Sequence, residues 1–94
     1  MTSLLEKVEK ELKLPREKII QQGVHQFLET EVRNFSIEIS KIVVKYGVSS
    51  FNELWDKIEK GEVSESECFD DLTRLEYLEL ERDKILNLLE TSEE

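Results

Sequence analysis

The sequence predicts an all-α protein, and three observations support this fold class. Apolar residues recur every three or four positions through most of the chain, which is the period of one face of an α-helix. Three Ser-x-x-Glu motifs are typical of helix N-termini, because each can satisfy backbone N–H groups that have no partner inside the helix. The 94 residues include 3 Gly and 1 Pro, too few for many short strands joined by tight turns.

A short helix is predicted at the start of the chain. Ser3 and Glu6 form the first capping motif, and apolar residues at helical spacing follow it. We expect this helix over residues 3–13, with Leu14 as the hinge to the next one.

A long second helix is predicted from Pro15 to Tyr46. Proline is favoured at the first helical position, and Gly47 is expected to end the helix in a left-handed conformation. The later apolar residues of this helix step by 4, 3, 4, 3 and 4 positions, a heptad pattern that predicts packing against another helix. We call these residues the heptad seam: Leu28, Val32, Phe35, Ile39, Ile42 and Tyr46.

The length of this helix predicts an assembly of more than one chain. Residues 15–46 would span about 48 Å at a rise of about 1.5 Å per residue. A compact domain of 94 residues does not need so long an element. We therefore expect a homodimer, or a complex with a partner helix, that is joined along the heptad seam.

Two more helices are predicted in the second half of the chain. Ser50 and Glu53 begin a helix of about ten residues that ends at Gly61. Ser64 begins the last helix, which we expect to continue to about residue 90. One side of this helix is apolar, and its other side carries Asp70, Asp71, Glu76, Glu79, Glu81 and Asp83.

Charge is divided unevenly along the chain. Residues 1–46 carry 8 Lys or Arg against 7 Asp or Glu, whereas residues 47–94 carry 5 against 15. Such asymmetry favours binding to a charged partner, because electrostatics controls association more than it controls fold. We interpret residues 1–94 as a single domain, with residues 1–46 as a near-neutral dimerisation body and residues 47–94 as an acidic arm that binds a partner.

Composition argues against several other classes of protein. A net charge of −9 makes nucleic-acid binding by this chain alone unfavourable. No apolar stretch is long enough to span a membrane, and no signal-peptide pattern is visible. A single cysteine cannot form an internal disulfide. We therefore expect a cytoplasmic protein.

Two residues were weighed as chemical sites. His25 is the single histidine; we expect it to be structural or partly exposed, with histidine phosphotransfer as an alternative. A carboxylate-bridged metal centre would need a second histidine. Cys68 has neighbouring carboxylates that oppose thiolate formation, so we expect it to contribute to packing. We accordingly predict no enzymatic activity, no cofactor and no metal.

Two segments resemble proteins of toxin–antitoxin pairs. Residues 14–23 (LPREKIIQQG), after a short amphipathic helix, resemble the helix-turn-helix part of ribbon-helix-helix antitoxins, and residues 46–51 (YGVSSF) with residues 61–63 (GEV) look like small archaeal antitoxin-like proteins. In that family a DNA-reading strand precedes the first helix. Because Met1 and Thr2 alone precede Ser3, we expect the DNA-binding ribbon to be missing.

The resemblance implies helices that wrap around a small basic toxin. It agrees with the charge division, so we predict a non-enzymatic antitoxin-like module that neutralises such a partner by helix-in-groove binding. The alternative is a homodimeric structural or adaptor protein that dimerises through the heptad seam. Trp55, Phe51 and Phe69 could instead form a core that docks the third helix onto the long ones. The predicted partner contacts are Trp55, Phe69, Leu72, Leu75 and Leu78 for the apolar part and Glu76, Glu79 and Glu81 for the electrostatic part.

Overall fold

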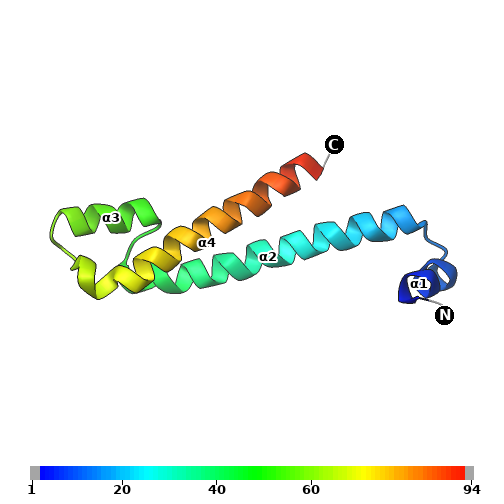
Figure 1. The fold of residues 1–94 in the computed structure, drawn as a ribbon, viewed down its shortest axis with the longest axis horizontal. Helices are drawn as coiled ribbons and strands as arrows, with labels where there is room; N and C mark the ends of the chain where they lie inside the picture. The colour runs from blue at the N-terminus through cyan, green and yellow to red at the C-terminus, as the bar shows by residue number, and fades with distance from the viewer. Residues whose placement is uncertain (1–2, 93–94) are drawn as a thin grey trace.

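The computed structural model describes residues 3–92, and within them the chain forms four helices and no strand. Figure 1 shows two long antiparallel helices, with a short helix at each end of the molecule. The predicted all-α class and the order of short, long, short and long helices are confirmed. The helices are α1 (Leu4–Leu12), α2 (Arg16–Tyr46), α3 (Phe51–Glu59) and α4 (Glu65–Ser92).

Serine side chains begin two of these helices as predicted. The Ser3 hydroxyl accepts the backbone N–H of Glu6 at 3.2 Å, before α1. The Ser50 hydroxyl accepts the N–H of Glu53 at 3.3 Å, before α3. Each bond satisfies an N–H that has no partner within its helix, which stabilises the helix start.

The turn between α1 and α2 differs from the prediction by one position. Lys13 adopts a left-handed conformation with φ 54°, and Leu14 is the hinge. Pro15 is the cap of α2 rather than its first helical residue, because its ψ of 143° is still extended. Its carbonyl accepts the N–H of Ile19 at 3.2 Å, so the helix begins at Arg16.

Glycine ends α2 as the sequence predicts. Gly47 has φ 65° and ψ 35°, a left-handed conformation that a residue with a side chain rarely adopts. The next N–H, from Val48, then donates to the carbonyl of Val43 at 3.0 Å and closes the last turn.

The core lies where α3 covers the packed ends of α2 and α4. Its six aliphatic side chains are at most 6% exposed. Burying a side chain of this kind stabilises the fold by about 1.5–3 kcal/mol. Both the near-neutral and the acidic part of the sequence contribute, so the change in charge after Tyr46 does not divide the packing. The six are Ile39, Ile42, Leu54, Leu72, Leu75 and Leu78.

Most of the heptad seam packs against α4 of the same chain. Ile39 and Ile42 are buried in the core, and Phe35 and Tyr46 pack against it. Ile39 and Ile42 are therefore enclosed by their own chain, which corrects their assignment to a dimer interface, whereas Phe35 and Tyr46 are half-buried. Leu28 and Val32, the first two residues of the seam, are half-buried.

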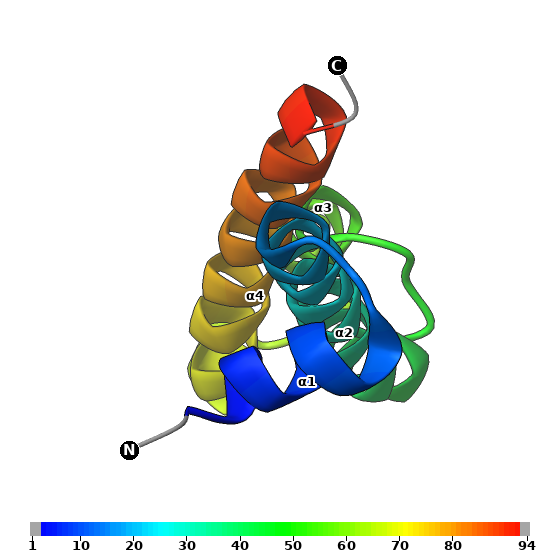
Figure 2. The same cartoon turned by 90° about the vertical axis from the view of Figure 1, so that its right-hand side faces the viewer.

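The molecule is elongated rather than compact. It measures 62 × 28 × 18 Å and has a radius of gyration of 19.5 Å. Figures 1 and 2 show α4 diverging from α2 toward its C-terminal end, while α1 crosses the far end of α2. No residue of α1 is buried, and an ion pair of 3.0 Å between Glu9 and Arg16 joins it to α2. Among the described helices, none combines the length and the apolar character needed to cross a membrane.

Replacing Leu75 with alanine should lower the free energy of unfolding by about 2–5 kcal/mol, because the side chain is fully buried and its removal leaves a cavity. The matched control is Leu80→Ala on the same helix; this side chain is exposed, so a change within about 0.5 kcal/mol is expected. Urea denaturation followed by circular dichroism at one chain concentration measures both. Equal losses would contradict the position of Leu75 in the core.

Candidate protein-binding surface

The outer face of α4 gathers large apolar side chains that the rest of the chain leaves uncovered. Phe69, Tyr77 and Leu80 are each 56% or 57% exposed. At 3.6 residues per turn these positions lie on the side of α4 that points away from the core. Single exposed apolar residues are ordinary, but several on one face are typical of an interaction surface.

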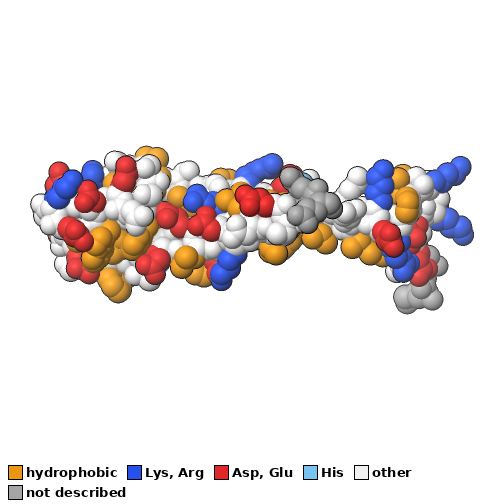
Figure 3. Space-filling model, turned by 90° about the horizontal axis from the view of Figure 1, so that it is seen from above, with side chains coloured by type: hydrophobic (Ala, Val, Ile, Leu, Met, Phe, Trp, Pro, Cys, Tyr) orange, Lys and Arg blue, Asp and Glu red, His pale blue; other side chains and the backbone are white. Residues whose placement is uncertain are grey.

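Carboxylates lie on the same side of the helix. Glu65 is one turn before Phe69, and Glu76 is one turn before Leu80. Both are exposed, and neither forms an ion pair with another residue of the described chain. Figure 3 shows that hydrophobic side chains and carboxylates also lie side by side at the end of the molecule that α3 forms. We call the apolar residues and the two carboxylates of this side of α4 the outer α4 face: Glu65, Phe69, Glu76, Tyr77 and Leu80.

The predicted apolar contacts divide into exposed and buried residues. Phe69 and Trp55 are exposed, which leaves them accessible to a partner. The assignment of Leu72, Leu75 and Leu78 to a partner is wrong for this fold, because α2 and α3 bury all three in the core. The apolar stripe that the sequence shows on the last helix is therefore the face that holds the molecule together.

Residues other than Trp55 supply the core contacts of α3. Leu54 is fully buried in the core, and Phe51 and Ile58 pack against it. These three residues supply the docking face of α3. Trp55 is 38% exposed and is not among the residues that pack against the core.

The three carboxylates predicted to contact a partner lie in different surroundings. Glu76 is exposed on the outer α4 face. Glu79 instead accepts the backbone N–H of Phe51 at 2.8 Å, so it caps α3 and its assignment to a partner is corrected. Glu81 pairs with Lys84 at 2.8 Å, one turn along the same helix.

Sequence reasoning missed Tyr77 and Leu80. They interrupt a row of carboxylates, and neither falls in the apolar stripe that dominates α4. Steps of 4, 3 and 4 residues from Phe69 lead through Thr73 and Glu76 to Leu80, on one side of the helix. A search along this side would have found Leu80, whereas Tyr77 lies one position beyond this row and carries no such signal.

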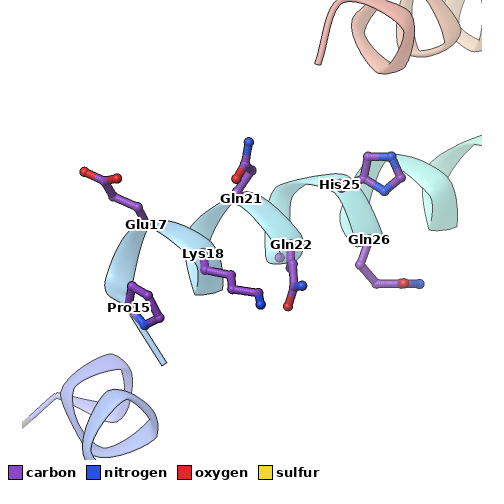
Figure 4. A pocket seen from close by; sticks show the side chains of 8 residues that line it. Pro15, Glu17, Lys18, Gln21, Gln22, His25 and Gln26 are labelled. Atoms are coloured by element: carbon purple, nitrogen blue, oxygen red, sulfur yellow. The ribbon is translucent and has the colours of Figure 1, made fainter. Parts of the chain in front are cut away.

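His25 lies on an open part of α2. Its Nδ1 atom is 3.4 Å from a carboxylate oxygen of Glu29. A shallow concavity nearby is lined by side chains of residues 15–26, and Figure 4 shows them projecting in different directions from one helix turn after another. This surface is open rather than enclosed, so it does not exclude water. Phosphotransfer at His25 remains a prediction.

Cys68 has the surroundings of a packing residue. Its side chain is buried at the start of α4, and this burial raises the pKa of the thiol. A raised pKa disfavours the thiolate, which is the reactive form. Within residues 3–92, no group of three or more His, Cys, Asp or Glu side chains is arranged to hold a metal ion.

A family model described as "Uncharacterized protein MJ0235 family" matches residues 1–93. The chain belongs to the MJ0235 family. It is similar to protein MJ0235 of Methanocaldococcus jannaschii, with 34% identity over 73 residues that cover 78% of this chain and 89% of that protein. No solved structure matches the chain. The archaeal relative agrees with the archaeal part of the predicted resemblance. Its antitoxin part stays a prediction, because the family name states no activity.

In this member of the MJ0235 family, one polar cluster joins the two long helices beside the core. The Asp71 carboxylate on α4 accepts hydrogen bonds from the Lys45 ammonium at 2.8 Å and the Tyr46 hydroxyl at 2.6 Å. The bonds from Lys45 and then Tyr46 hold the pKa of Asp71 below its usual range. The same Asp71 bond raises the pKa of Tyr46.

This polar cluster also reaches α3. The Lys57 ammonium donates to the backbone carbonyl of Tyr46 at 3.0 Å and so fixes the last turn of α2. Every one of these groups is engaged with another part of the chain. The cluster therefore orients the helices that carry the outer α4 face.

Asp71→Asn should destabilise the protein more at pH 7 than at pH 3. A folded-state pKa below the unfolded value of about 3.9 contributes stability above that value, and the contribution is lost as the pH falls through the folded pKa. Urea denaturation of the unmodified protein and of Asp71→Asn at both pH values measures this loss of stability. The difference between their urea midpoints should be smaller at pH 3 than at pH 7. An equal difference at the two pH values would contradict the role of the ionised Asp71. Glu76→Gln, an exposed change on the same helix, is the control, and its urea midpoint should stay close to that of the unmodified protein at either pH.

Proposed function

We propose that this protein is a non-enzymatic module that binds a small basic protein through the outer α4 face. The observation that carries the proposal is the exposure of Phe69, Tyr77 and Leu80 beside Glu65 and Glu76, whose carboxylates form no ion pair within residues 3–92. Apolar anchors of this kind supply affinity once a partner excludes water from them. The carboxylates supply charge complementarity toward a basic partner.

The charge of the surrounding chain supports the same choice of partner. Residues 47–94 carry 15 Asp or Glu against 5 Lys or Arg, so an approaching basic protein meets an attractive field. An acidic or nucleic-acid partner would be repelled by it. The exposed aromatic ring of Trp55 on α3 adds an apolar group within the same acidic half.

An antitoxin is the specific form of this proposal. It rests on the resemblance of residues 14–23 and 46–51 to antitoxin-like proteins. A small toxin that binds RNA presents cations where it contacts phosphates. Carboxylates held on a rigid helix would cover such a surface and block it.

Reversing the charges of the outer α4 face should abolish partner capture. We expect affinity purification of the tagged protein from its native host to recover a small basic protein in fixed stoichiometry, identified by mass spectrometry. Glu65→Lys combined with Glu76→Lys should lose it, because two attractive contacts become repulsive. Glu79 is left intact in this test, since its carboxylate caps α3.

The control variant carries Glu6→Lys and Glu11→Lys in α1, which changes the net charge by the same amount at exposed positions far from α4. This variant should retain the partner. Equal capture by both variants would refute a role for the outer α4 face, and equal loss would show that net charge alone controls binding.

A homodimeric structural or adaptor role is the second candidate function, and the shape of the chain favours it. A compact domain of 94 residues has a radius of gyration of about 12 Å, far below the observed 19.5 Å. In this role the protein would form a stable homodimer and retain no basic partner in the same purification.

A further inference from the structure

The first half of α2 and the last half of α4 leave apolar side chains uncovered where the two helices diverge. On α2, Ile20, Val24 and Phe27 are between 49% and 62% exposed. On α4, Leu86 is exposed and Ile85 is half-buried. Figures 1 and 2 both show these two halves separating from each other. We call this part of the molecule, residues 16–31 of α2 and residues 79–92 of α4, the open end.

The open end continues the helix faces that form the core. On α4, Leu75 and Leu78 are followed by Arg82, Ile85 and Leu89 in steps of 4, 3 and 4 residues, along one side of the helix. On α2, the heptad seam extends back from Leu28 to Val24 by the same kind of step. The faces buried at one end of the hairpin are thus left partly uncovered at the other.

The surface area of the chain indicates how much remains to be covered. A folded monomer of 11.1 kDa is expected to expose about 5,700 Å². This chain exposes 7237 Å², which exceeds that expectation by about 1,500 Å². A stable protein–protein interface of standard size covers about 800 Å² on each partner. The excess is therefore large enough for one such interface.

Arg82 is a second, independent observation at the same place. It occupies a core-facing position just where the helices begin to separate. Its Nε atom is buried and donates to no acceptor among the described residues, and its nearest ion-pair partner is Asp83 at 3.8 Å. The side chain as a whole is 31% exposed, so the outer nitrogens of its guanidinium are accessible to a carboxylate of a second chain. Charged or polar residues at such positions also fix the register of helical assemblies.

The local charge of the open end permits a second copy as the partner. Residues 16–31 carry 2 Lys or Arg against 3 Asp or Glu, and residues 79–92 carry 2 against 4. Most of the excess of carboxylates therefore lies at the other end of the hairpin, in α3 and the first half of α4. When two copies meet open end to open end, these acidic ends point away from each other, and a twofold axis closes the assembly.

We propose that two copies of this chain interlock through their open ends to form a homodimer. The first half of α2 and the last half of α4 of each copy build a four-helix bundle at the centre of the assembly. Ile20, Val24, Phe27 and Leu86 become its core. The interface uses the sides of the helices that face away from the outer α4 face, so the dimer does not depend on capture of a basic protein.

Light scattering coupled to size-exclusion chromatography tests this proposal on the full chain. The expected mass is about twice the chain mass of 11.1 kDa, as for a twofold dimer. Val24→Glu combined with Phe27→Glu should give a monomer, because it places charges in the proposed bundle core. Phe69→Glu combined with Leu80→Glu is the matched control: it should remain a dimer and lose the basic partner.

Folding is followed separately, so that an unfolded variant does not decide the result. The unfolding temperature of the unmodified protein should rise with chain concentration, as mass action requires of a dimer. Leu86→Glu, on the other helix of the open end, should also weaken dimerisation while far-ultraviolet circular dichroism stays helical. A monomer at every concentration would overturn the proposal. A dimer lost in the Phe69 and Leu80 variant but kept in the Val24 and Phe27 variant would overturn it as well.

Discussion

The antiparallel packing of α2 against α4 determines where every other surface of this protein lies. Ile39 and Ile42 meet Leu72, Leu75 and Leu78, and α3 closes this contact with Leu54. Once the aliphatic side of α4 is turned inward, its opposite side must face solvent. The polar bonds of Asp71 to Lys45 and Tyr46 lie beside this core and join the same two helices.

The position of the core follows from the number of helices at each end. Two helices touch along a narrow strip, so side chains on its flanks stay partly exposed, whereas a third helix can enclose them. Here α3 is that third helix, and Leu54 is fully buried beneath it. At the open end no equivalent helix of the described chain covers the strip. Val24 and Phe27 consequently remain exposed although their faces are continuous with the buried ones.

The helix ends could be predicted from short motifs in the sequence. Which helices pack against each other could not be predicted from the pattern of apolar residues. Serine caps and the left-handed Gly47 depend on neighbours within four residues, so their motifs are sufficient. A heptad pattern predicts which side of a helix packs against another helix, but it does not identify that helix as part of the same chain or of a partner. For this reason Ile39 and Ile42 were assigned to a dimer, and Leu72 and Leu75 to a partner, when they cover each other. Glu79 was misassigned similarly, because its bond to the N–H of Phe51 spans 28 positions.

The two proposed interfaces have the chemistry that different kinds of binding require. The open end exposes mainly apolar side chains and is less acidic than the other end of the hairpin, which suits an obligate contact between copies. The outer α4 face combines exposed apolar groups with carboxylates, which suits a partner that arrives by electrostatic steering. Because these faces lie on opposite sides of α4, both can be occupied at once. A dimer would then present two outer α4 faces, and a basic partner with two contact sites would gain affinity through effective concentration without any new contact.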